Sequence, residues 1–169
     1  MTEIDVLART IWGEARNQNT RGMEAVAHVV LNRLAVSKQR KIFWWGNTIE
    51  EICLHPKQFS CWNYSDPNRE RLLSITDEDK EFKIALEIAE DACAGLLVFD
   101  ITNGATHYYN PSVVQFSPVW SKGEIPLKII GDHNFYRPRE VPRLIDKDFC
   151  IVTRKKPSLF TWIWHLFFK

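Results

Sequence analysis

The stretch "LARTIWGEARNQNTRGMEAVAHVVLNRL", residues 7–34, decides the fold because it holds two amphipathic helical patterns separated by a polar break. The break is "NQNTRG", residues 17–22. Before it, apolar side chains recur at helical spacing, at Ile4, Leu7, Ala8, Ile11, Trp12 and Ala15. After it they recur at Met23, Val26, Ala27, Val30, Leu31 and Leu34. Spacings of three and four residues place each set on one face, so the stretch predicts two helices that bury those faces.

Glu14 lies at the edge of the first apolar stripe, roughly 90° from its centre at about 100° per residue. It is also near the C-terminus of that helix, where the macrodipole is negative, and apolar neighbours would remove part of its hydration. Both effects favour the protonated carboxyl, whereas Arg9 and Arg16 would favour the ionised one. Position alone therefore allows two interpretations: a solvated helix-end residue, or an acid whose proton takes part in chemistry.

The rest of the chain predicts further helices and little regular sheet. Thr2 can cap the first helix, with Asp5 three residues later. "VSKQRK", residues 36–41, ends the second helix, and a short helix is expected around residues 48–53. Acidic residues open a third long helix within residues 76–95, which Gly95 can close. Residues 98–120 read as loop with short strands, and residues 125–138 as one more strand or turn. The sequence thus predicts a mainly α (α+β) protein with long loops.

The length of 169 residues fits one globular domain, expected over residues 1–140, followed by a basic and aromatic tail over 141–169. Within that tail, residues 158–169 form an almost continuous apolar run of about 12 residues, or roughly 18 Å as a helix, which is too short to cross a bilayer. Two interpretations stay open: a terminal helix docked on the domain, and an interfacial segment that makes peripheral membrane contact.

Composition disfavours several classes of function. The net charge of +1 gives no strong field for nucleic acid, and no helix-turn-helix or RNP pattern is present. The opening residues, 1–12, lack a charged leader and a long apolar stretch, so we expect synthesis in the cytoplasm without a signal peptide. The four cysteines form no CxxC pair and are expected to stay reduced. Seven tryptophans and ten phenylalanines suit either a carbohydrate-binding cleft or an aromatic core.

Two further segments combine polar groups with aromatic rings. "QFSCW", residues 58–62, is either a loop packed by its own rings or part of a sugar site. Its Cys61 could serve as a thiol nucleophile with a histidine as base, from His55, His107 or His133. "ATHYYNP", residues 105–111, precedes "SPVW" and "IGDHNFYR"; its His107, with His133, could instead bind zinc, although no compact metal-binding spacing supports this.

Together, "LARTIWGEARNQNTRGMEAVAHVVLNR", "QFSCW", "ATHYYNP" and "IGDHNFYR" resemble the cell wall hydrolase family of spore cortex-lytic enzymes (SleB-like), in order from about residue 4 to residue 137. The resemblance implies a lysozyme-like helical fold with a substrate cleft that acts on peptidoglycan glycan strands. It implies that the glutamate of the "EAR" motif, here Glu14, is the catalytic acid, and that neither a cofactor nor a metal is required. Substrate contacts are expected from Gln58, Phe59, Tyr108, Tyr109, Asn110 and Trp120, with His133 and Tyr136 bracing the cleft wall.

The expected reaction is cleavage of the β-1,4 bond between N-acetylmuramic acid and N-acetylglucosamine, as a lytic transglycosylase. Muramidase-type hydrolysis of the same bond is the alternative, and it would need a second carboxylate from Glu24, Asp66 or Asp132. A non-catalytic wall-binding module is the alternative from another class. The site of action is expected to be the cell wall, reached either as a phage-released endolysin or as a spore-associated enzyme.

Overall fold

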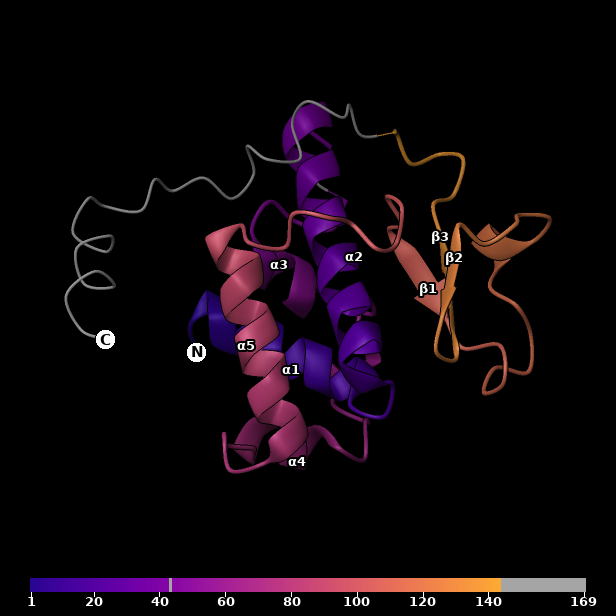
Figure 1. The fold of residues 1–169 in the computed structure, drawn as a ribbon. Helices are drawn as coiled ribbons and strands as arrows, with labels where there is room; N and C mark the ends of the chain where they lie inside the picture. Colours follow the sequence, from indigo (N-terminus) through magenta and orange to yellow (C-terminus); the bar gives the residue numbers. More distant parts are fainter. Residues whose placement is uncertain (43, 144–169) are drawn as a thin grey trace, which may run out of the picture.

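The structure, a computed structural model, describes residues 1–42 and 44–143. Figure 1 shows the helices gathered on one side of the molecule and a small sheet on the other, with the longest helix between them. The helices are α1 (Glu3–Ala15), α2 (Asn19–Arg40), α3 (Ile49–Leu54), α4 (Arg69–Ser74) and α5 (Lys80–Ala94). Two single-turn 3-10 helices are η1 (Ser60–Trp62) and η2 (Val119–Ser121). The strands are β1 (His107–Tyr109), β2 (Lys128–Ile130) and β3 (His133–Tyr136).

The predicted helix ends are confirmed by their caps. The Thr2 hydroxyl accepts a hydrogen bond from the Asp5 amide at 3.2 Å, and the Thr48 hydroxyl caps α3 through the Glu51 amide at 3.1 Å. Gly95 adopts the left-handed conformation that closes α5, at φ 75°. The second helix is longer than its apolar pattern, since it begins at Asn19 inside the predicted break and ends within "VSKQRK". The sequence missed α4, whose only fully buried side chain is Leu72.

α1 forms the centre of the helical side and contacts α2, α3, α4, α5 and η1. Its apolar stripe is buried, and the main hydrophobic cluster extends from it through all five helices to Val141. α2 buries a second face against the sheet, where a small cluster joins Ala25, Val29, Ala105, Ile130 and Phe135. Two buried faces explain why the apolar residues of α2 do not follow one simple stripe.

The sheet is antiparallel with the order β1-β3-β2, so the predicted strand or turn over residues 125–138 is a hairpin of two strands. Polar tethers fix this hairpin on the helices: Gln18 donates to Asp132 at 2.9 Å and accepts from the Asp132 amide at 2.8 Å. The turn approaches so closely that a Cβ on Gly131 (φ 56°) would lie 2.3 Å from the Gln18 side-chain oxygen. Glycine is therefore required at this contact.

Within the described ranges, no helix combines the length and the apolar character that crossing a bilayer requires. The expected boundary between a domain over 1–140 and a tail over 141–169 stays a prediction, and residues 158–169 lie outside the described residues. Cys53, Cys61 and Cys93 carry free thiols.

Candidate active site

Glu14 occupies the last turn of α1 and joins the helical side to the sheet. Its side chain is half-buried beside the fully buried Ala15, as its place at the edge of the stripe predicts. One carboxyl oxygen, Oε1, accepts from the Cys61 amide at 3.1 Å and the Ser60 hydroxyl at 3.4 Å. The other, Oε2, accepts from the Tyr108 phenol at 2.9 Å. Groups separated by 46 to 94 residues in sequence thus meet on one carboxyl group.

Gly13 makes the contact with η1 sterically feasible. A Cβ at this position would lie 2.5 Å from the Cys61 Cβ and 2.8 Å from its sulfur, closer than packed atoms tolerate. The absence of a side chain lets η1 approach α1, which brings the Cys61 amide within hydrogen-bonding distance of Glu14. A backbone donor carries no side-chain signature, so the sequence alone does not predict this contact.

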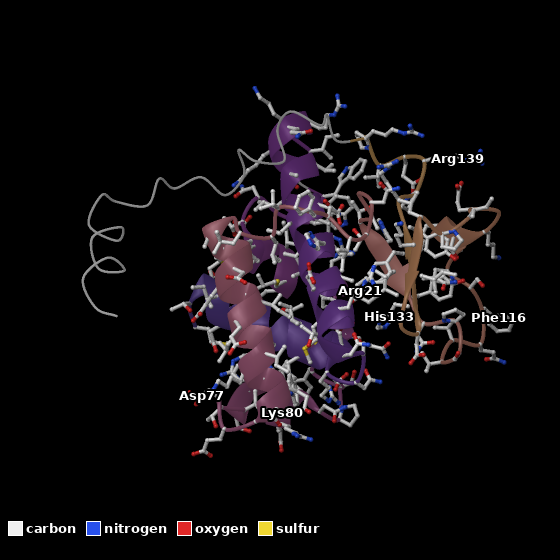
Figure 2. All side chains as sticks on the ribbon, in the orientation of Figure 1. Arg21, Asp77, Lys80, Phe116, His133 and Arg139 are labelled. Atoms are coloured by element: carbon white, nitrogen blue, oxygen red, sulfur yellow. The ribbon has the colours of Figure 1, made fainter. Side chains whose placement is uncertain are left out.

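Tyr108 reaches Glu14 from the face of β1 that packs on the helices. Its ring lies 5.5 Å from Phe135 and 5.1 Å from His133 on the neighbouring strand. Figure 2 shows His133 on the side of the sheet nearer α2. Burial, together with the negative charge of Glu14, raises the pKa of Tyr108 well above its ordinary value. The phenol therefore keeps its proton and acts as a donor to the carboxylate.

The arginines expected to influence Glu14 are engaged elsewhere. Arg9 binds the Asp5 carboxylate at 3.0 Å and donates to the backbone carbonyls of Leu72 and Ile75, which end α4. Arg16 donates to the Gly13 carbonyl at 3.1 Å and lies over the Trp12 ring at 4.5 Å. Both therefore stabilise the helical side.

Three of the expected substrate contacts gather on the other face of β1. Successive residues of a strand point to opposite faces, so Tyr109 lies away from Tyr108. Its ring stacks on Tyr136 at 5.7 Å and meets Trp120 edge-on at 5.8 Å. Asn110 follows the strand and closes a turn through the Ser112 amide at 2.8 Å. We call the rings of Tyr109, Trp120 and Tyr136, together with Asn110, the second aromatic cluster. Its residues make none of the hydrogen bonds to Glu14 that are described above.

The two expected contacts from the "QFSCW" segment differ from each other. Gln58 is half-buried in the turn before η1. Phe59 is only 1% exposed and belongs to the main core. The guanidinium of Arg33 covers its ring at 5.0 Å. With no open face, Phe59 supports the site from beneath.

The thiol and zinc alternatives find little support in the geometry. Burial is the main cause that raises the pKa of the Cys61 thiol, and the adjacent Glu14 charge adds to it, so a thiolate is strongly disfavoured. Burial also lowers the pKa of His107 to about 4. Across the described part of the chain, no group of three or more His, Cys, Asp or Glu side chains is placed to hold a metal ion.

Each carboxylate considered as a partner for Glu14 already has a structural contact. Glu24 lies 3.5 Å from the ring nitrogen Nε2 of His28. Asp66 accepts from the Asn68 amide at 2.8 Å, and Asp132 binds Gln18. Their contacts explain their presence without a catalytic role.

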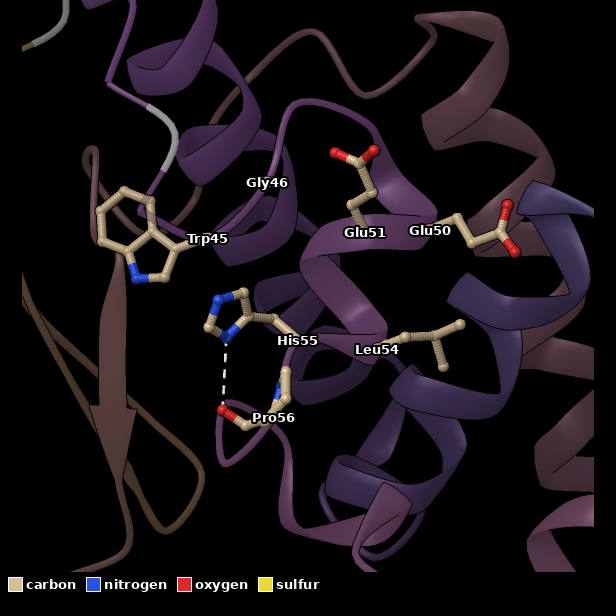
Figure 3. Close-up of a pocket in the computed structure, with 7 residues that line it drawn as sticks. All are labelled: Trp45, Gly46, Glu50, Glu51, Leu54, His55 and Pro56. Atoms are coloured by element: carbon tan, nitrogen blue, oxygen red, sulfur yellow. Dashed lines mark hydrogen bonds between the residues drawn. The ribbon is translucent and has the colours of Figure 1, made fainter.

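A cavity of about 480 Å³ opens beside α3 and is lined by residues of the segment 45–56. Figure 3 shows the Trp45 and His55 rings facing each other across it, while the Glu50 and Glu51 carboxylates extend away. Glu14 is not among its lining residues. The buried Trp45 ring links this cavity to the interior, because it also contacts His107 at 5.9 Å and Arg33 at 5.4 Å.

The helical core with a half-buried acid at its junction with a small sheet is a lysozyme-like arrangement. The chain belongs to the cell wall hydrolase family, whose model, described as Cell Wall Hydrolase, matches residues 17–136. The matched range begins after Glu14, so this match does not itself assign the acid.

Curated relatives and solved structures agree with this family. Spore cortex-lytic enzymes of Bacillus cereus and Bacillus subtilis are each 28% identical over 79% of this chain, and the matches cover 43% and 37% of their lengths. The chain thus spans about two fifths of the curated relatives. The catalytic domain of the germination-specific lytic transglycosylase SleB from Bacillus anthracis matches with a TM-score of 0.58 at 24% identity, covering 80% of this chain and 93% of that domain. The Bacillus cereus SleB catalytic domain gives 0.56 at 24% identity, covering 80% and 89%.

Proposed function

We propose that this chain cleaves the β-1,4 bond between N-acetylmuramic acid and N-acetylglucosamine in peptidoglycan, as a lytic transglycosylase with Glu14 as its single acid and base. The observation that carries the proposal is the Glu14 carboxyl, half-buried and bound by the Tyr108 phenol and the Cys61 amide. Membership of the cell wall hydrolase family supplies the substrate class.

In this mechanism, protonated Glu14 donates its proton to the glycosidic oxygen, and the bond from that oxygen to the muramic C1 breaks. Positive charge develops at C1, where the neighbouring N-acetyl group stabilises it. The Glu14 carboxylate is stabilised at this stage by the hydrogen bonds from Tyr108 and Cys61. It then removes the proton of the sugar's own 6-hydroxyl, whose oxygen attacks C1 and closes a 1,6-anhydro ring.

Transglycosylation is preferred to hydrolysis because it needs only one carboxylate. Hydrolysis by a retaining or inverting enzyme uses two carboxyl groups at a set separation. Glu24, Asp66 and Asp132 each have the structural contacts described above, whereas Glu14 combines partial exposure with donors from two separate elements. A substrate that supplies its own nucleophile removes the need for a second acid.

Glu14→Gln tests the assignment. The amide has nearly the shape of the acid but cannot donate the required proton, so lysis of purified peptidoglycan should fall by about 1,000-fold or more. Glu90→Gln makes the same chemical change at an exposed position of α5 and should retain full activity. Lysis by Glu14→Gln at the wild-type rate would eliminate Glu14 as the acid.

The same experiment separates the alternatives. A clear zone in a zymogram indicates cleavage, whereas binding to wall sacculi without clearing would identify a wall-binding module. Activity that survives thiol blockers and chelators excludes a cysteine or zinc enzyme. Muramidase-type hydrolysis would leave free reducing ends in place of anhydro ends.

The glycan strand is proposed to contact Tyr108 and Gln58 near Glu14, and to extend toward Tyr109, Asn110 and Trp120 on the second aromatic cluster. The cell wall is the proposed site of action. A phage-released endolysin and a spore-associated enzyme both act there, and neighbouring genes distinguish them. Membrane contact through residues 158–169 stays a prediction that flotation with anionic vesicles tests.

A further inference from the structure

α2 carries a buried arginine, Arg33, that takes no direct part in the proposed proton transfer. Arg33 is only 3% exposed, and its guanidinium lies between the rings of Phe59, at 5.0 Å, and Trp45, at 5.4 Å. Its Nε donates to the Thr106 carbonyl at 2.8 Å. Burying a charge is costly unless opposite charge and hydrogen bonds compensate, so this placement requires an explanation.

The described residues provide Arg33 with little direct compensation. None of their carboxylates lies within ion-pair distance of it, and its Nη1 is buried without a hydrogen-bond acceptor among them. Burial lowers the pKa of Arg33 to about 10, so the group remains charged at neutral pH. The negative charges that favour its protonated form are those of Tyr108, Cys53 and Glu14. Burial keeps the Tyr108 phenol and the Cys53 thiol neutral, which leaves the Glu14 carboxylate as the negative charge of this set.

The hydrogen bond from Arg33 also fixes the residue that precedes β1. Thr106 directly precedes β1, and its own amide donates to the Tyr136 carbonyl at 2.9 Å. The preceding residue of α2, Asn32, donates to the Ala105 carbonyl at 2.9 Å and to Asp100 at 3.0 Å. α2 therefore holds the start of the strand whose second residue, Tyr108, donates to Glu14.

We propose that Arg33 is a positioning residue of this site: it fixes the start of β1, and hence the Tyr108 phenol, and its positive charge stabilises the carboxylate that Glu14 becomes after donating its proton. This inference rests on the proposed role of Glu14. It identifies a group that does not touch the substrate and acts through two residues that line the reaction centre.

Two variants separate the charge from the hydrogen bond. Arg33→Gln retains an N–H donor for Thr106 and loses the charge, whereas Arg33→Lys retains the charge but loses the planar fork. Arg21→Gln is the matched control, because it removes the same charge from an exposed position of the same helix, labelled in Figure 2. The other titratable groups that interact with Glu14, namely Tyr108, Cys61 and His133, are unchanged in all three variants.

We expect Arg33→Gln to lower the rate on purified glycan strands about tenfold and to move the alkaline limb of the pH–rate profile upward by about one pH unit, because Glu14 then retains its proton to higher pH. Arg33→Lys should leave that limb within a few tenths of a unit, and Arg21→Gln should change neither quantity. Thermal unfolding verifies that each variant is folded. If Arg33→Gln fails to fold, Arg33→Met replaces it as the charge-free variant. The alkaline limb should then be shifted upward in Arg33→Met and unshifted in Arg33→Lys.

A folded, charge-free variant whose alkaline limb coincides with the wild-type limb would overturn the inference, as would equal shifts in the Lys and Gln variants. Failure of the proposed function looks different, because Glu14→Gln would then remain active. Inactive Glu14→Gln together with an unmoved limb in Arg33→Gln refutes only the role of Arg33.

Discussion

The helical side of the molecule and the sheet side are held together by different forces. The helices share one large apolar cluster that extends from α1 to Val141. The sheet contacts α2 through a small apolar cluster and is fixed mainly by polar tethers, from Gln18, Asn32, Arg33 and Glu14. Apolar burial is nonspecific and strong, whereas hydrogen bonds are directional and individually modest. We infer that the helices provide stability and the tethers provide the geometry at Glu14.

The largest expected effect on stability comes from the helical side. Leu7→Ala removes a fully buried side chain of α1 two turns before Glu14 and should lower the free energy of unfolding by about 2–5 kcal/mol. The activity of the folded fraction at low temperature should stay within about twofold of wild type, because the tethers are unaffected. Denaturant unfolding and lysis assays measure the two quantities. A severe loss of specific activity in the folded protein would show that packing within the helices also determines the geometry at Glu14.

Gly13→Ala disrupts the close contact between η1 and α1. Its Cβ would overlap Cys61, so overpacking should cost about 1–3 kcal/mol of stability and displace the Cys61 amide from Glu14. Activity should therefore fall more than stability explains, by about tenfold or more. Glu90→Ala, a substitution at an exposed position of α5, is the control and should leave activity unchanged. Equal activity of the two variants would show that the amide of Cys61 is dispensable.

Acid should loosen the sheet side before the helical side. The pKa of His107 in β1 is lowered by burial to about 4, while the unfolded chain takes up this proton near pH 6.5. The stabilising contribution is therefore present above pH 6.5 and is lost as the pH falls toward 4, by about 2 kcal/mol after screening. Hydrogen exchange should show β1 and β3 losing protection first, and His107→Gln should remove part of this pH dependence. Simultaneous loss in α1 and β1 would argue for one cooperative unit.

Removing single hydroxyl groups from Tyr108 and Tyr109 should have the smallest effect on stability, and it compares the two faces of β1 directly. Tyr108→Phe removes the donor to Glu14 but retains the packed ring, so the rate should fall about tenfold with little change in stability. Tyr109→Phe deletes the same atom on the opposite face, where the hydroxyl contacts Ser117, and should retain most activity. Rates on soluble glycan fragments measure both. Equal losses would place the reaction centre on the second aromatic cluster instead.

The sequence predicted the helical side well because its signals are local. Caps such as Thr2 and Gly95, and stripes such as that of α1, are determined by neighbours a few residues away. α4 was missed because it has only six residues, half of them charged, and buries only Leu72. The hairpin of β2 and β3 was read as one element because its strands have three and four residues.

The candidate site was only partly predictable. The helical periodicity places Glu14 at the edge of the apolar stripe of α1, but it does not distinguish a catalytic acid from a solvated helix-end residue. The prediction that Glu14 is the catalytic acid came from the family resemblance. Its contact with Tyr108 spans 94 residues, and the Cys61 donor is a backbone amide, so neither leaves a local pattern. Arg33 ends the stretch that carries the family resemblance. A charged residue in a helix normally indicates an exposed face, so its burial is seen only in the structure.

One carboxylate suffices if the sugar supplies the nucleophile, and digestion in water enriched in the heavy oxygen isotope distinguishes this route from attack by water. We expect products that end in 1,6-anhydro-muramic acid, lighter than hydrolysis products by one water and free of the isotope. Heavy oxygen at a new reducing end would show that water attacks the muramic C1, and it would contradict the single-carboxylate mechanism.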